Sequence, residues 1–295
     1  MNALSLSTSS DAPPHHLPET LIEGGDRKQG LNLGELWNAR ELVILLAWRD
    51  IQVRYKQTVL GAAWAILQPL LMMVVFTIFF GRLAGLSEGP LPYSLFTLTG
   101  LLPWMMFATT VTAASNSVVG SERLITKVYF PRLAIPLASA GPAIVDFLVG
   151  ISLVFVMGLY HGFVFGRATA LPAWTAPLCL GLLAVELALA MGIGLWLATL
   201  NVMYRDARYV VPFLLQIWMF STPTLYMQKP PDSGLPYLFW LANPMTPLLQ
   251  GFRGLLFGLP IAKKELILAT LVSGLVFASG VWFFRRFERQ FADVI

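Results

Sequence analysis

The sequence predicts an all-α integral membrane protein, and composition, hydropathy and segment length support that prediction. Of its 295 residues, 56% are hydrophobic and 12% are charged, against about 25% charged residues in a typical soluble domain. The mean hydropathy is +0.68, so the apolar surface exceeds what one water-soluble core of this length can bury. Long apolar runs between basic loops therefore indicate membrane-spanning helices.

The N-terminal residues 1–30 predict a disordered cytoplasmic tail ahead of a single transmembrane domain over residues 31–295. They are rich in Ser, Pro, Gly and His, and they lack the apolar core of a signal peptide. His15 and His16 are adjacent but have too few companion ligands for a metal site.

An amphipathic interface helix is predicted over residues 35–56. Aromatic and aliphatic residues fall on one side of its helical wheel: Trp37, Ile44, Trp48, Ile51 and Tyr55. Charges interrupt the segment too often for it to cross a bilayer, so we expect it to lie in the cytoplasmic interface of the membrane. The same pattern also suits a helix that packs against a soluble partner.

Six transmembrane helices are predicted after the interface helix. Their expected bounds are 59–81, 93–119, 135–160, 172–200, 209–227 and 265–284. At about 1.5 Å per residue each can cross a hydrocarbon core of roughly 30 Å. Asp146 and Glu186 are acids inside apolar spans, and each suits either a polar pathway or a helix-packing role. Residues 221–262 hold short apolar pieces between prolines, which predict re-entrant external helices.

The distribution of Lys and Arg predicts the orientation. Fourteen of the 20 basic residues lie on the side of the N-terminus, so the positive-inside rule places both termini in the cytoplasm. The net charge of +4 then reflects topology and contact with membrane lipids, and no nucleic-acid partner is expected.

The cytoplasmic loop over residues 120–136 predicts a docking element. Ser121 suits an N-cap and Pro131 a stop, so we expect a short helix that exposes basic and apolar residues together. Its candidate docking residues are Glu122, Arg123, Leu124, Ile125, Lys127, Phe130, Pro131 and Arg132. An ordinary positive-inside loop explains the basic residues of this set but not the apolar ones.

No enzymatic motif accompanies these elements. The sequence has no phosphate loop, no HExxH, no GxSxG and no paired Cys or His ligands. We therefore expect no catalytic residue, metal or cofactor in this chain, and an energy source on another subunit.

Five motifs, in order, resemble the membrane subunit of bacterial ABC exporters for O-antigen, capsular polysaccharide and teichoic acid. They are RDIQVRYKQTVLGAAWAILQP (49–69), ERLITKVYFPR (122–132), NVMYRDARY (201–209), STPTLY (221–226) and NPMTPLLQGFRGLL (243–256). The resemblance implies a homodimeric permease of the bacterial inner membrane, bound to two ATPase subunits that hold ATP and Mg²⁺. The cargo would be a polyprenyl-pyrophosphate-linked polysaccharide, an O-antigen or a capsule; small-molecule efflux is the alternative.

The resemblance also implies roles for particular segments. The 122–132 motif matches the coupling helix that inserts into the ATPase, and the turn at Leu60 and Gly61 is similar to the loop beside the cytoplasmic substrate entrance. The 221–226 motif and the start of the 243–256 motif would form an external gate.

Physical reasoning adds cations at phosphate depth before the first span, which suit an anionic headgroup or bulk anionic lipid. The full set of expected entrance residues is Arg49, Arg54, Tyr55, Lys56, Leu60 and Gly61. A channel for a weakly charged glycan would offer aromatic faces, and the candidates are Trp64, Trp104, Phe107, Trp218, Phe220 and Tyr226. Aromatic residues also form interfacial belts and packing in membrane proteins.

Two other classes of membrane protein fit less well. A glycosyltransferase would need loop carboxylates, and the loops here offer only scattered ones such as Asp206 and Asp232. A secondary transporter would show inverted repeats, and the sequence has no matching halves.

Overall fold

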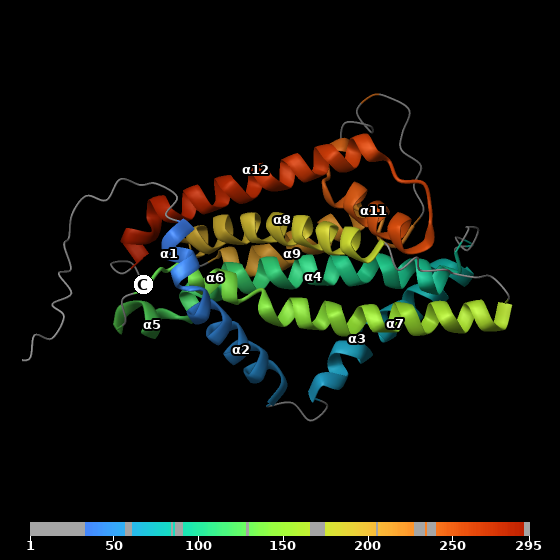
Figure 1. Cartoon of the computed structure of the whole chain (residues 1–295), viewed down its shortest axis with the longest axis horizontal. Coiled ribbons are helices and arrows are strands. Elements are labelled where there is room, and N and C mark those ends of the chain that lie inside the picture. Colours follow the sequence, from blue (N-terminus) through green and yellow to red (C-terminus); the bar gives the residue numbers. More distant parts are fainter. Residues whose placement is uncertain are drawn as a thin grey trace, which may run out of the picture. The chain divides into compact units, whose positions relative to one another are not determined.

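The computed structural model describes residues 33–56, 61–83, 85, 91–127, 130–165, 175–204, 206–226, 234 and 240–291. All regular structure in these ranges is helical (Figure 1). The predicted tail, residues 1–30, lies outside the described ranges.

The helices before and within the first apolar stretch are α1 (Leu33–Asn38), α2 (Arg40–Lys56), the 3₁₀ turn η1 (Gly61–Ala63), α3 (Trp64–Phe76) and the π-helix η2 (Thr77–Leu83). The middle of the chain forms α4 (Tyr93–Gly120), α5 (Glu122–Lys127), α6 (Ala134–Ala138), α7 (Gly141–Phe165) and α8 (Ala176–Met203). The last part forms α9 (Ala207–Ser221), α11 (Met245–Phe257), α12 (Lys263–Phe287) and the 3₁₀ turn η4 (Glu288–Gln290).

Within the described residues, five helical segments are long and apolar enough to cross a membrane. They are Gly61–Leu83, Tyr93–Gly120, Ala134–Phe163, Pro177–Met203 and Lys263–Phe287. These segments correspond to five of the six predicted spans and establish a multi-pass membrane protein.

The predicted span over residues 209–227 is not among the five. Its helix, α9, has 15 residues, a rise of about 22 Å, which is short of a hydrocarbon core of roughly 30 Å. The helix ends at Ser221 because Thr222 is extended (φ −105°, ψ 140°), as expected for a residue that precedes a proline.

The long helices α4, α8 and α12 lie next to one another in the described fold. Helix α8 contacts both α4 and α12, and the three run side by side (Figure 1). Gly192 and Gly280 allow this packing, because a Cβ atom at Gly280 would lie less than 3.0 Å from the backbone of Gly192. Small residues at a contact of this kind let two membrane helices approach backbone to backbone.

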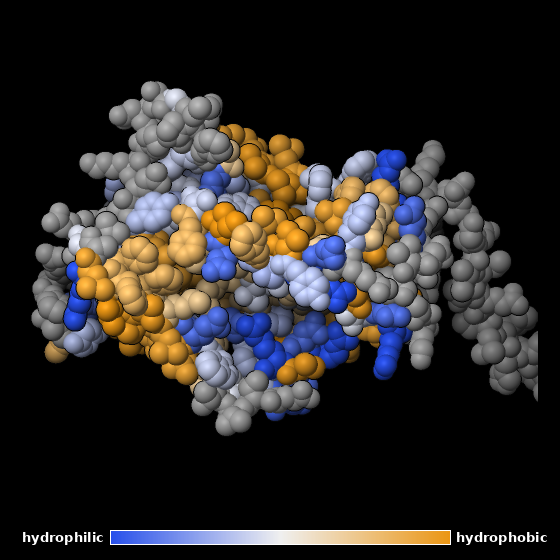
Figure 2. Space-filling model, turned by 180° about the vertical axis from the view of Figure 1, so that it is seen from behind, coloured by the Kyte–Doolittle hydropathy of each residue, from blue (hydrophilic) through white to orange (hydrophobic). Residues whose placement is uncertain are grey.

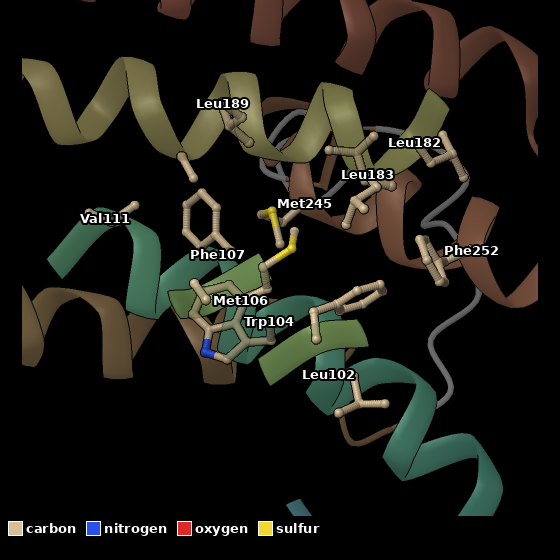
Figure 3. Close-up of a cluster of buried hydrophobic side chains, with 14 of the residues drawn as sticks. Leu102, Trp104, Met106, Phe107, Val111, Leu182, Leu183, Leu189, Met245 and Phe252 are labelled. Atoms are coloured by element: carbon tan, nitrogen blue, oxygen red, sulfur yellow. The ribbon is translucent and has the colours of Figure 1, made fainter. Parts of the chain in front are cut away.

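The main apolar core fills the space between α4, α8 and α11. Figure 3 shows Met106 and Phe107 of α4 beside Met245 of α11, with Leu183 and Leu189 of α8 across from them. Phe107 and Met245 are fully buried.

The outer surface carries many large apolar side chains, as a lipid-facing surface does. Val75 of α3, Leu159 of α7, Phe213 of α9 and Leu275 of α12 are all exposed. Figure 2 shows hydrophobic areas spread over the face opposite to that of Figure 1. A soluble monomer rarely exposes apolar surface on this scale.

The predicted interface helix forms two helices, with a turn at Ala39 between α1 and α2. Trp37, Ile44 and Trp48 are 68%, 66% and 60% exposed. Three of the five stripe residues are therefore exposed in this chain, whereas Ile51 and Tyr55 at the end of the stripe are half-buried.

Candidate functional site

The last turn of α2 meets α7 at a single carboxylate. Arg54 forms an ion pair with Asp146, with 2.5 Å between Nη2 and Oδ2. The hydroxyl of Tyr55 donates a hydrogen bond to the other carboxylate oxygen, Oδ1. Asp146 lies in the second turn of α7, so two neighbouring α2 residues bind one acid 91 residues further along the chain.

Burial and the contact with Asp146 raise the pKa of Tyr55. Partial burial and, second, the hydrogen bond to Asp146 raise the pKa of Tyr55 to about 12. The phenol is protonated at neutral pH, as an unperturbed tyrosine is, and the raised pKa keeps it a hydrogen-bond donor to Asp146 at alkaline pH as well.

A pocket of about 190 Å³ opens beside the ion pair, between α2, α3, α4 and α7. Its polar wall is made by Arg54, Tyr55, Gln68, Thr109 and Asp146. The other lining residues are Gly61, Trp64, Ala65, Pro69, Leu102, Met105, Met106, Ala143 and Phe147. Figure 1 shows α2 and α3 on the same side of α7. The site thus offers one exposed cation next to an apolar cavity.

Four residues predicted from sequence line this pocket, and others do not. Arg54, Tyr55 and Gly61 come from the entrance set and Trp64 from the aromatic set. Leu60 lies outside the described residues. Gly61 has φ +50°, a conformation that glycine adopts without steric cost.

The other two entrance cations have neighbours on their own helix. Arg49 pairs with Asp50 at 2.8 Å, and Lys56 donates to Gln52 at 3.1 Å. Both contacts are exposed, and none of these four residues lines the pocket. Arg54 is therefore the cation that α2 presents to the pocket.

Sequence reasoning left the role of Asp146 open and did not single out Gln68, Thr109 or Phe147. Asp146 was visible as a single acid in an apolar span. The sequence did not indicate that Arg54 and Tyr55 are its partners, because this pairing depends on how α2 and α7 pack.

The predicted docking loop forms α5 and the turn that follows it. Glu122 and Arg123 are exposed, as a docking surface requires. Ile125 is only 7% exposed, so the expectation that it faces solvent is wrong: it belongs to the chain's own apolar packing. Lys127 ends the helix, and Phe130, Pro131 and Arg132 are half-buried.

A second apolar cluster connects this loop to α2 and the C-terminal end. Ile125 shares it with Leu46 of α2, Phe284 of α12 and Phe291. Phe284 and Phe291 are in edge-to-face contact, with 5.2 Å between ring centroids. Arg132 also donates a hydrogen bond to the backbone carbonyl of Glu288. The docking loop, α2 and the end of α12 thus share one apolar cluster.

The six aromatic candidates occupy three environments. Trp64 and Phe220 are exposed, at 46% and 51%. Trp104 and Phe107 are buried and pack with Trp218, the Phe107 and Trp218 rings lying 5.1 Å apart. Tyr226 is half-buried and donates to the Phe220 carbonyl at 3.2 Å.

Arg253 organises the segment after α9, and sequence reasoning did not identify it. Its guanidinium donates to the carbonyls of Pro223, Thr224 and Phe96 at 2.9, 2.7 and 3.2 Å, and lies 3.7 Å from the centre of the Phe96 ring. This buried cation ties α11, the 222–226 turn and α4 together.

Glu186 of α8 is buried, with 1% exposure, and its Oε1 atom has no hydrogen-bond partner among the described residues. It lies among the core residues of α8 and does not line the pocket beside Arg54.

Comparison with known proteins covers most of the chain. Residues 41–257 match the ABC-2 type transporter family. The chain is 30% identical over 264 residues to the O-antigen export system permease protein RfbA of Myxococcus xanthus, an alignment that covers 88% of this chain and 98% of that protein. It is 27% identical over 273 residues to the protein of the same name from Klebsiella pneumoniae, covering 91% of this chain and 99% of the relative.

Proposed function

The chain belongs to the ABC-2 type transporter family, and from this premise we propose that it is the permease of an ATP-driven exporter of polyprenyl-pyrophosphate-linked O-antigen. The observation that supports this most is the near end-to-end similarity to O-antigen export permeases from two organisms, which leaves almost no part of those relatives uncovered.

The pocket beside Arg54 is the proposed reception site for the lipid-linked headgroup. A pyrophosphate carries several negative charges and is bound well by a guanidinium. Arg54 is 40% exposed, so a headgroup in the inner leaflet can reach it. Trp64 and Phe147 on the apolar wall suit the first isoprenoid or sugar unit beside the phosphate.

The finer topology is part of the proposal. We propose six crossings, of which α9 and the 222–226 turn together make the fifth. Both termini would then lie in the cytoplasm, and the membrane would be the bacterial inner membrane. Helix α11, which has 13 residues between Pro244 and Gly258, would be re-entrant and, with the 222–226 turn, form the external gate.

The working assembly would be a homodimer bound to two ATPase subunits that carry ATP and Mg²⁺. The exposed Glu122 and Arg123 of α5 are the proposed contact with the ATPase. A pull-down with the full-length chain tests this: Arg123→Glu should reduce the recovered ATPase, whereas Arg208→Glu, an exposed charge reversal outside the loop, should not.

Deletion of the gene tests the function. We expect surface O-antigen to be lost and polyprenyl-linked glycan to accumulate on the cytoplasmic face of the inner membrane, and the wild-type chain should reverse both changes. Unchanged surface glycan together with altered drug sensitivity would contradict the proposal and favour small-molecule efflux.

A further inference from the structure

The cation proposed to receive the headgroup is already paired. Arg54 and Asp146 are 2.5 Å apart at the mouth of the pocket, so a phosphate that binds Arg54 competes with a carboxylate of the same chain. Asp146 is 23% exposed, against 40% for Arg54. The arginine is therefore the more accessible member of the pair.

Two features make this pair suited to opening. Phosphate and carboxylate both bind a guanidinium bidentately, but a pyrophosphate carries more negative charge than a carboxylate, so it is the stronger partner. When Arg54 leaves, Asp146 keeps the hydrogen bond from Tyr55, so its carboxylate is not left without a donor, which would be costly in a partly buried site.

The pair also connects two helices with different neighbours. Helix α2 contacts α6 and α7, and Ala47 packs against Gly141, where a Cβ would lie 2.9 Å from the Ala47 Cβ. The preceding residue, Leu46, reaches the apolar cluster that contains Ile125 of α5. Arg54 is thus about two helical turns along α2 from Leu46, which packs in the cluster beneath the proposed ATPase contact.

We propose that Arg54 and Asp146 form a latch between α2 and α7 that an anionic phosphate opens, with Asp146 as a built-in competitor that sets the affinity for the headgroup. This inference rests on the proposed function in one respect, namely that a phosphate-bearing lipid is the ligand. Asp146 is a positioning residue in this scheme, since it acts through Arg54.

A double-mutant cycle tests the latch with farnesyl pyrophosphate as the probe. The full-length chain is placed in nanodiscs of phosphatidylcholine, which carry no net charge, and binding is measured by calorimetry. Asp146→Asn keeps an acceptor for Tyr55 but removes the competing charge, so it should tighten binding about tenfold. Asp50→Asn, the matched exposed pair on the same helix, should leave binding unchanged.

Repeating Asp146→Asn in an Arg54→Gln chain shows whether Asp146 lowers the affinity for the probe by pairing with Arg54 or by repelling the anion directly. If Asp146 acts through Arg54, Asp146→Asn should change affinity less than about twofold once Arg54 is gone. A tenfold gain that persists in Arg54→Gln, or no gain in the wild-type background, would refute the latch.

Further probes identify the part of the ligand that opens it. Farnesol should not bind at this site, and inorganic pyrophosphate should show the same cycle at lower affinity. If nanodiscs of phosphatidylglycerol abolish the effect of Asp146→Asn, bulk anionic lipid is the partner and the headgroup assignment is wrong.

Hydrogen–deuterium exchange gives a readout that needs no variant. Farnesyl pyrophosphate should increase amide exchange at the α2 end that carries Arg54 in the wild-type chain, and unchanged or slower exchange there would contradict opening. The exporter proposal is tested separately by gene deletion. If the deletion abolishes surface O-antigen but the effects of Asp146→Asn and Arg54→Gln on binding are additive, the latch is refuted and the exporter proposal stands.

Discussion

Arg253 of α11 lies against Gly100 of α4 so closely that a Cβ atom at Gly100 would be less than 3.0 Å from Nη2 of the arginine and from the carbonyl oxygen of Thr224. The missing side chain at Gly100 leaves the space in which the guanidinium reaches three carbonyls. The turn after α9 is thus positioned by one arginine and one glycine.

Gly100→Ala should destabilise the protein. The added methyl group meets the backbone of Thr224, which cannot move aside as a flexible side chain can, so we expect a loss of about 1 to 3 kcal/mol. Thermal unfolding in detergent measures the change. Gly181→Ala in α8, where nothing lies within 4 Å, is the matched control and should be neutral or slightly stabilising. Equal melting temperatures for the two variants would contradict the packing described here.

Arg253→Lys should also destabilise the protein, although it retains the positive charge. A lysine ammonium cannot reproduce the planar fork that serves the carbonyls of Pro223 and Thr224 together. We expect a loss of about 2 to 4 kcal/mol, again by thermal unfolding. If Arg253→Lys melts at the wild-type temperature, a positive charge at this position is sufficient for stability and the planar guanidinium is not required.

Phe291→Ala should weaken the contact between the C-terminal end and the docking loop. Phe291 is buried, with 1% exposure, in the cluster that includes Ile125, and its removal leaves a void that costs about 3 to 5 kcal/mol. Surface O-antigen should fall while the ATPase still copurifies. Gln290→Ala changes an exposed neighbour and should leave export normal; reduced export in both variants would point to a non-specific effect.

Tyr55→Phe should lower stability by an amount that does not vary with pH near neutrality. Because the folded-state pKa is about 12, above the unfolded value of roughly 10, the contribution of Tyr55 is fully present below the unfolded pKa. It is lost only as the pH rises through the folded pKa. The difference in melting temperature between wild type and variant should therefore be constant from about pH 6 to 9. A difference that changes within this window would show that another group titrates at the site.

The sequence predicted those parts of the fold that depend on local pattern. Apolar length located five membrane-crossing segments, and the aromatic stripe located α2 and its exposed Trp48. The pattern did not predict where α9 ends: the apolar run over residues 209–227 continues past Ser221, but Thr222, which precedes Pro223, is extended and ends the helix.

The candidate site was predictable only in part, for a similar reason. Arg54 and Tyr55 stood out because they precede the first span. Their shared partner, Asp146, and the burial of Trp104 and Phe107 against Trp218 arise from packing between helices far apart in the sequence. No local spacing encodes such contacts, as the three carbonyls around Arg253 also illustrate.

Photocrosslinking at the pocket tests the central claim most directly. A benzoylphenylalanine introduced in place of Trp64, which lines the pocket beside Arg54, is irradiated in cells that make the lipid-linked glycan. We predict a crosslinked product that carries the glycan, that is lost when Arg54→Gln is added, and that does not form from the same probe in place of Trp37, which is 68% exposed on α1. No glycan adduct at position 64, or an equal adduct at position 37, would contradict the account.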